Sequence, residues 1–167
     1  MNLGYYIYKD FLRVFVEMLK ENAKGGLLSV VLYGSVAKGR AKPSSDIDLL
    51  ILYRKSENNL NEIYPEIVIK ARETKEYEEL IKEGIFVEIS PYLVTVEELK
   101  ENPLILLDII DEGIVLYDKD ESFKYLMEKF REKIKELGSR KVFLPDGSYY
   151  WELKPDWRPG EVVEIKI

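Results

Sequence analysis

Two short apolar runs, residues 27–33 and 47–53, constrain the fold more than any other feature of this sequence. Both runs are rich in Leu, Ile and Val, and Gly34 ends the first, so each is typical of a largely buried strand. Only residues 34–46 connect them, a short connection that favours antiparallel neighbours over the crossover that parallel strands require. We therefore predict two adjacent antiparallel strands, with their connecting loop at one end of a sheet.

The rest of the chain alternates helical and strand patterns around this pair. The sequence predicts an α/β (or α+β) domain with a mixed central sheet flanked by helices. Residues 1–138 would form the main domain, and residues 139–167 a hairpin-like extension packed on it. The predicted elements are helices at about 8–24, 66–83, 103–112 and 121–137, a short helix capped by Thr95 and Glu98, strands at 85–90 and 114–117, a loop at 55–65, and a hairpin of 142–144 with 149–153.

Composition excludes several classes of chemistry. The 167 residues contain no Cys and no His, so disulfides, thiolate nucleophiles, imidazole bases and Cys/His zinc sites are excluded. The net charge of −6 argues against strong nucleic-acid binding. No apolar stretch approaches the roughly 18 residues of a membrane span, and the first residues do not resemble a signal peptide, so we expect a cytoplasmic protein. Abundant Lys and Glu without Gln or Cys suggest a thermophile.

The loop after the first strand has the residues of a phosphate-binding turn. Gly34 and Ser35 stand where the strand gives way to a turn, and a glycine there lets the backbone approach a ligand closely. Successive amides in such a turn form an anion site, to which Ser35 can donate a further hydrogen bond. Lys38 and Arg40 are the better candidates for additional phosphate contacts, although for each a solvated loop position is an equal alternative.

Three acidic residues suggest a site for divalent cations. Asp46 and Asp48 flank Ile47, and because side chains alternate along a strand, both carboxylates project to one face. Carboxylates this close repel each other, and Mg²⁺ is a natural counterion because it accepts one or two carboxylates plus substrate phosphates. Glu88 is the single acid of the strand predicted at 85–90. If that strand lies beside the pair, three carboxylates can hold two Mg²⁺ ions; otherwise Glu88 faces solvent.

The Gly34-Ser35 turn, ten intervening residues and Asp46-Ile47-Asp48 resemble the motif of the DNA polymerase beta nucleotidyltransferase superfamily. The short chain most resembles its minimal nucleotidyltransferases (MNT), over residues 27–90. The resemblance implies the nucleotidyltransferase fold for residues 1–138, a turn that binds triphosphate, and aspartates that bind Mg²⁺. It also implies a later strand acid, which Glu88 matches although family members commonly have Asp there.

This resemblance implies transfer of a nucleoside monophosphate, above all AMP from ATP, to a hydroxyl acceptor. Many MNT proteins are antitoxins paired with HEPN toxins, so the implied acceptor is a tyrosine of a HEPN-domain partner. Two alternatives stay open. One is a non-catalytic antitoxin that covers its partner; the other is a transferase for a small molecule of the antibiotic type, which usually needs a larger acceptor-binding domain.

The C-terminal segment carries no motif of this family but is rich in aromatic residues. Tyr149, Tyr150, Trp151 and Trp157 would suit contact with a base or with a partner protein. Packing against the domain is the interpretation that we favour.

Overall fold

The computed structural model describes residues 2–55 and 59–167, which form a four-stranded sheet, a two-stranded sheet and the helices around them. In chain order the elements are α1 (Tyr5–Asn22), β1 (Leu27–Tyr33), α2 (Gly34–Ala37), β2 (Ile47–Tyr53), α3 (Leu60–Ala71), α4 (Lys75–Lys82), β3 (Ile89–Thr95), α5 (Val96–Glu101), the 3-10 helix η1 (Pro103–Ile105), α6 (Leu106–Ile109), β4 (Ile114–Asp118), the 3-10 helix η2 (Lys119–Glu121), α7 (Ser122–Glu136), β5 (Arg140–Phe143) and β6 (Tyr149–Glu152).

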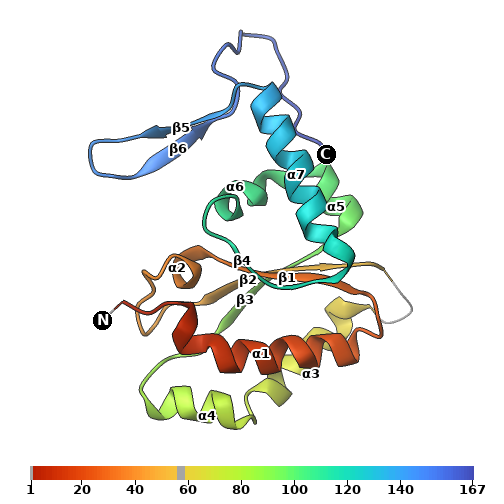
Figure 1. Ribbon diagram of the computed structural model, residues 1–167, viewed down its shortest axis with the longest axis vertical. Coiled ribbons are helices and arrows are strands. Elements are labelled where there is room, and N and C mark those ends of the chain that lie inside the picture. The colour runs from red at the N-terminus through yellow and green to blue at the C-terminus, as the bar shows by residue number, and fades with distance from the viewer. Residues whose placement is uncertain (1, 56–58) are drawn as a thin grey trace.

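The main sheet has the strand order β3-β2-β1-β4. Strand β1 pairs antiparallel with both β2 and β4, whereas β3 runs parallel to β2. Figure 1 shows α1, α3 and α4 on one face of this sheet and α5, α6 and α7 on the other. The mixed sheet flanked by helices confirms the predicted fold class, and the pairing of β1 with β2 confirms the predicted antiparallel neighbours.

Side-chain alternation along β2 divides the core into two layers. Ile47 and Leu49 lie in the apolar cluster that includes α1 and α3, and Leu50 lies in the cluster that includes α6 and α7. All three are fully buried. Asp48 lies on the same face of β2 as Leu50. It therefore projects from the sheet face that α5, α6 and α7 cover, near the first residue of the strand.

The third strand begins later than the sequence predicts. The prediction of a strand at 85–90 is wrong for most of that range, because β3 starts at Ile89. The amide of Phe86 donates instead to the carbonyl of Pro43 (2.9 Å), which keeps this stretch out of the ladder. The ladder with β2 begins at the carbonyl of Glu88, which accepts from the first amide of β2 at 2.8 Å. Glu88 thus immediately precedes β3 rather than lying within it.

The helix predicted at 66–83 is two helices. The chain leaves α3 after Ala71 and begins α4 at Lys75. Thr74 caps the second helix, since its side chain accepts a hydrogen bond from the amide of Tyr77 (3.3 Å). The continuous Glu- and Lys-rich pattern hid this break, because a capping threonine interrupts the backbone without interrupting the polar composition.

The loop predicted at 55–65 is also partly wrong. Helix α3 begins at Leu60, where the side chain of Asn59 accepts a hydrogen bond from the amide of Asn61 (3.2 Å). Residues 56–58 lie outside the described residues. Asparagine favours both loops and helix N-caps, and here the capping role prevails.

The helix predicted at 103–112 is the 3-10 helix η1 followed by the short α6, which ends at Ile109. The other predicted elements are present. Thr95 and Glu98 form a capping box at the start of α5, and β4 covers the strand predicted at 114–117. The predicted C-terminal hairpin is formed by β5 and β6, which pair antiparallel and project from the body of the protein beside α6 and α7 (Figure 1). Within residues 2–55 and 59–167, no helix is both long enough and apolar enough to cross a membrane.

Asp118 joins the main sheet to α7, and we expect its replacement by alanine to destabilise the fold. Its carboxylate accepts hydrogen bonds from the hydroxyl of the fully buried Ser29 (2.6 Å) and from the amides of Phe123 (2.9 Å) and Lys124 (3.1 Å). Asp118→Ala leaves the hydroxyl and the helix amides without this acceptor, at a cost of about 2–3 kcal/mol. Urea denaturation measures this loss. Asp10→Ala, the same change at an exposed position on α1, should cost much less.

Candidate active site

The phosphate-loop candidates lie directly after β1. Gly34 begins the short helix α2 with a φ of +70°, a backbone conformation that side chains rarely adopt. A Cβ atom at this position would also collide with the carboxylate of Asp48, lying 2.9 Å from its Cγ. Only glycine allows both the turn and this close approach. The sequence-predicted turn and the second aspartate are therefore in direct contact.

The loop that follows is held by backbone hydrogen bonds. The amide of Arg40 donates to the carbonyl of Ser35 (2.9 Å), which closes the turn around α2. Further along, Ala41 and Leu3 exchange two hydrogen bonds, from the amide of Leu3 (2.7 Å) and from the amide of Ala41 (3.1 Å). This fixed backbone places Ser35 and the loop cations at the same sheet end as the aspartates.

The two aspartates lie at the start of β2. Asp48 is half-buried and pairs in register with Tyr33 of β1, whereas Asp46 is exposed just before the strand. Burial raises the pKa of the Asp48 carboxyl above its ordinary value, and the negative charge of Asp46 raises that pKa further. A hydrogen bond with the side chain of Ser90 acts in the opposite direction. Asp48 therefore carries a charge that its present surroundings only partly compensate.

Three neighbours of Asp48 escaped prediction from the sequence. Ser90 is its register partner on β3, and a correct start for that strand would have identified it. Asp108 on α6 also raises the pKa of Asp48, although nothing in the sequence indicates which residues α6 brings toward the sheet. Tyr33 responds in turn: burial and then the charges of Asp48 and Asp108 raise its pKa to about 12. Its hydroxyl stays protonated at neutral pH.

Glu88 is engaged elsewhere. Its carboxylate accepts a hydrogen bond from Nη2 of Arg72 at 3.1 Å, at the end of α3. It also lies near Tyr64, whose buried hydroxyl has no hydrogen-bond partner among residues 2–55 and 59–167 and whose pKa is raised by burial and then by Glu88. Both contacts belong to α3, on the sheet face opposite α6. The structure thus places Glu88 at the right sheet end but does not bring its carboxylate to Asp48.

The two predicted loop cations share one partner. Nζ of Lys38 lies 3.5 Å from Oε2 of Glu112, and Nη2 of Arg40 lies 3.9 Å from Oε1 of the same residue. Glu112 lies in the turn between α6 and β4. Lys38 and Arg40 are therefore close to each other, as a shared phosphate ligand would require.

The donor set fits one Mg²⁺ ion better than two. Asp46 and Asp48 supply oxygen ligands, and a cation would neutralise the charge that burial makes unfavourable on Asp48. In the described parts of the chain, no group of three acidic side chains is close enough together to hold a metal. A ligand role for Glu88 stays a prediction, and it requires the carboxylate to leave Arg72.

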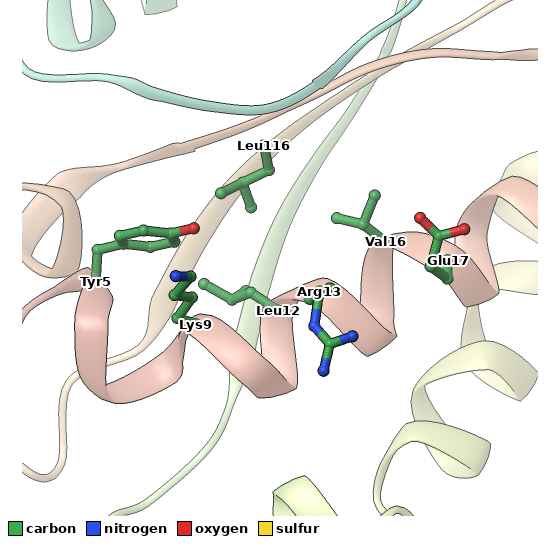
Figure 2. A pocket seen from close by; sticks show the side chains of 7 residues that line it. All are labelled: Tyr5, Lys9, Leu12, Arg13, Val16, Glu17 and Leu116. Carbon is green, nitrogen blue, oxygen red and sulfur yellow. The ribbon is translucent and has the colours of Figure 1, made fainter.

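A surface cavity of about 140 Å³ lies elsewhere, between α1 and β4. Figure 2 shows two of the side chains that line this cavity, Tyr5 at the start of α1 and Leu116 of β4. Its lining residues are Tyr5, Lys9, Leu12, Arg13, Val16, Glu17 and Leu116. None of the predicted site residues lines this cavity, so it is separate from the candidate active site.

Comparison with known proteins gives the family of the chain. The chain matches the family described as "Nucleotidyltransferase domain" over residues 12–142, a range that contains the turn, both aspartates and Glu88. A protein of Methanocaldococcus jannaschii named "Putative protein adenylyltransferase" is 29% identical over 150 residues, which are 86% of this chain and 92% of that protein.

Two solved structures show weaker likenesses. A mutant of the toxin-antitoxin MntA-HpeT is 16% identical with a TM-score of 0.48, over 74% of this chain and 86% of that one. A complex of a tri-AMPylated Shewanella oneidensis HEPN toxin with an MNT antitoxin is 15% identical with a TM-score of 0.43, over 75% and 85%. The family assignment rests on the sequence match.

That match spans most of the chain, from within α1 to β5. It confirms the family resemblance seen in Gly34-Ser35 and Asp46-Ile47-Asp48, and it identifies the protein as an enzyme that transfers nucleotidyl groups. The chain belongs to the nucleotidyltransferase domain family.

Proposed function

We propose that this nucleotidyltransferase transfers AMP from ATP to a hydroxyl group of a protein, with Mg²⁺ as its cofactor. The observation that carries the proposal is the contact between Gly34 and Asp48, which sets a phosphate-binding turn directly against an acid able to bind a metal. AMP and a protein acceptor are supported by the Methanocaldococcus jannaschii relative, whose name describes a protein adenylyltransferase.

Each residue of the site has a role in this proposal. The backbone of Gly34 and the hydroxyl of Ser35 bind the phosphates, and Lys38 and Arg40 neutralise their charge. Asp46 and Asp48 would hold Mg²⁺, which when bound polarises the phosphates and offsets their charge. Catalysis of this kind depends on position and charge, so the lack of histidine is no obstacle.

The transfer itself balances without a further reactant. The acceptor oxygen forms a bond to the α-phosphorus of ATP, and the bond from that phosphorus to the bridging oxygen breaks. Pyrophosphate leaves with the electron pair, and the hydroxyl proton passes to Glu88 or to water. Glu88 can take this proton only when its carboxylate is free of Arg72, with which it is now paired at 3.1 Å.

The proposal also covers the protein that accepts AMP and the compartment in which transfer takes place. The resemblance to MNT proteins favours a tyrosine of a HEPN-domain protein as the acceptor and an antitoxin role in the cytoplasm. Occlusion of that partner without catalysis is the second candidate, since the ion pairs of Glu88 and Glu112 are those of a site not yet arranged for transfer. The net charge of −6 continues to argue against nucleic acid as the acceptor.

Transfer of labelled AMP tests the proposal. The protein is incubated with ATP labelled at the α-phosphate and Mg²⁺, together with a candidate HEPN-domain partner, and that partner is then weighed by mass spectrometry. We expect a gain of one or more AMP groups, lost on adding EDTA and reduced when GTP, CTP or UTP replaces ATP. Association without a mass increase would favour occlusion. Absence of any Mg²⁺-dependent nucleotide binding would overturn the proposal.

A further inference from the structure

One carboxylate, that of Glu112, holds both cations of the phosphate loop. It contacts Lys38 at 3.5 Å and Arg40 at 3.9 Å, from the turn that follows α6. The Lys38 side chain is only 21% exposed, so Glu112 meets it where most of the solvent is already excluded. In this structure the groups proposed to receive phosphate are therefore already paired with an anion.

This pairing is easily replaced by a phosphate group. Charge-assisted hydrogen bonds are about 2.7–2.9 Å long, and both contacts of Glu112 are well beyond that range. Glu112 and Arg40 are also substantially exposed, at 42% and 72%. The Arg40–Glu112 pair is exposed on both sides and therefore weak, and to both cations a triphosphate brings several charged oxygens in place of one carboxylate.

We propose that Glu112 competes with the outer phosphates of the nucleotide for Lys38 and Arg40. It occupies these two cations before nucleotide binds and returns to them as pyrophosphate leaves. The inference rests on the proposed function, because it takes these two cations as ligands of the outer phosphates. Once displaced, Glu112 remains as a negative charge beside the bound phosphates. It therefore weakens binding of the triphosphate substrate and of the pyrophosphate product alike, and it favours product release.

The adjacent residue supplies a matched control. Asp111 carries the same charge in the same turn, but its carboxylate pairs with Lys141 of β5 instead of with the phosphate loop. If Glu112 acted only through its negative charge, Asp111→Asn and Glu112→Gln would increase the affinity for ATP equally. If Glu112 competes specifically for Lys38 and Arg40, only Glu112→Gln increases it.

Calorimetric titration of the whole chain with ATP, pyrophosphate and AMP, each with Mg²⁺, tests the inference. We expect Glu112→Gln to bind ATP and pyrophosphate about 2- to 5-fold more tightly at low ionic strength, the range expected for exposed ion pairs. Binding of AMP should not change, since its single phosphate does not need the loop cations. In 1 M salt the gain should vanish, because charges are then screened within about 3 Å.

A double-mutant cycle identifies the partner through which Glu112 acts. In a Lys38→Met background, Glu112→Gln should increase the affinity for ATP much less than it does alone, because the lysine for which the glutamate and the phosphate compete is gone. Equal gains in Glu112→Gln and Asp111→Asn, or no gain in Glu112→Gln, would overturn the inference. If the unaltered protein binds no nucleotide with Mg²⁺, it is the proposed function that fails.

Discussion

Replacing Asp48 with asparagine should reduce AMP transfer by about 10²- to 10³-fold or more while the protein stays folded. Asparagine keeps the shape and can still hydrogen-bond with Ser90, the partner of the present carboxylate. What it removes is the negative charge that would bind Mg²⁺ against the Gly34 turn. Removing one preorganised electrostatic contact of a reacting centre commonly has an effect of this size.

The same substitution should raise stability, which separates loss of function from loss of fold. Folding raises the pKa of Asp48 above its unfolded value, so the folded protein binds this proton more tightly than the unfolded chain. Its contribution to stability is present at low pH and is lost as the pH rises through the raised pKa. At pH 7 without divalent cations, the neutral Asp48→Asn variant should therefore have a higher thermal midpoint than the natural protein.

Transfer of labelled AMP and thermal unfolding measure the two effects. Asp10→Asn is the matched control, an equal change of charge at an exposed position on α1, and we expect it to leave transfer within about twofold, as for most surface substitutions. An Asp48→Asn variant that transfers AMP at the natural rate would contradict the assignment of Asp48.

Gly34→Ala should destabilise the protein by about 2–4 kcal/mol and abolish Mg²⁺-dependent nucleotide binding. Two costs add. An alanine at a φ of +70° is strained by about 1–2 kcal/mol, and its methyl group would force the Asp48 carboxylate aside. Because that displacement separates the turn from the acid, binding should be lost even where the variant still folds.

Gly39→Ala is the control that separates backbone strain from the collision with Asp48. Gly39 has a similar φ of +64°, but a Cβ atom there would have nothing within 4 Å. We expect about 1–2 kcal/mol of destabilisation and retained nucleotide binding. Urea denaturation and calorimetric titration with ATP measure both variants. Similar losses of binding in the two variants would show that loop strain, and not contact with Asp48, is what matters.

The parts of this site that are close in sequence could be predicted, and the parts that are distant could not. Residues 34–48 contain the turn, the cations and both aspartates, and strand alternation with a short connection was sufficient to place them at one sheet end. The positions of Ser90, Asp108 and Glu112 depend on how β3 and α6 pack against the rest of the sheet. The local sequence pattern does not predict that packing.

Glu88 shows a different limit. The sequence left open whether Glu88 lies beside the aspartates, and the structure places its backbone there, since its carbonyl accepts the first ladder hydrogen bond from β2. The direction of its side chain was not predictable, since the partner that holds it, Arg72, ends a helix whose boundaries the sequence obscured. The start of β3 and the break between α3 and α4 escaped prediction for related reasons. Backbone hydrogen bonds set the first and the Thr74 cap sets the second, and the hydrophobic pattern indicates neither.

The antiparallel pairing of β1 with β2 also bears on the order in which the site assembles. The two strands are joined by a loop of modest length, so the entropy lost in closing it is small and this pair can form early in folding. The pairing of β2 with β3 must enclose two helices before Ser90 reaches Asp48. A nascent chain can therefore form the Gly34 turn and the start of β2 well before it forms the surroundings that set the pKa of Asp48.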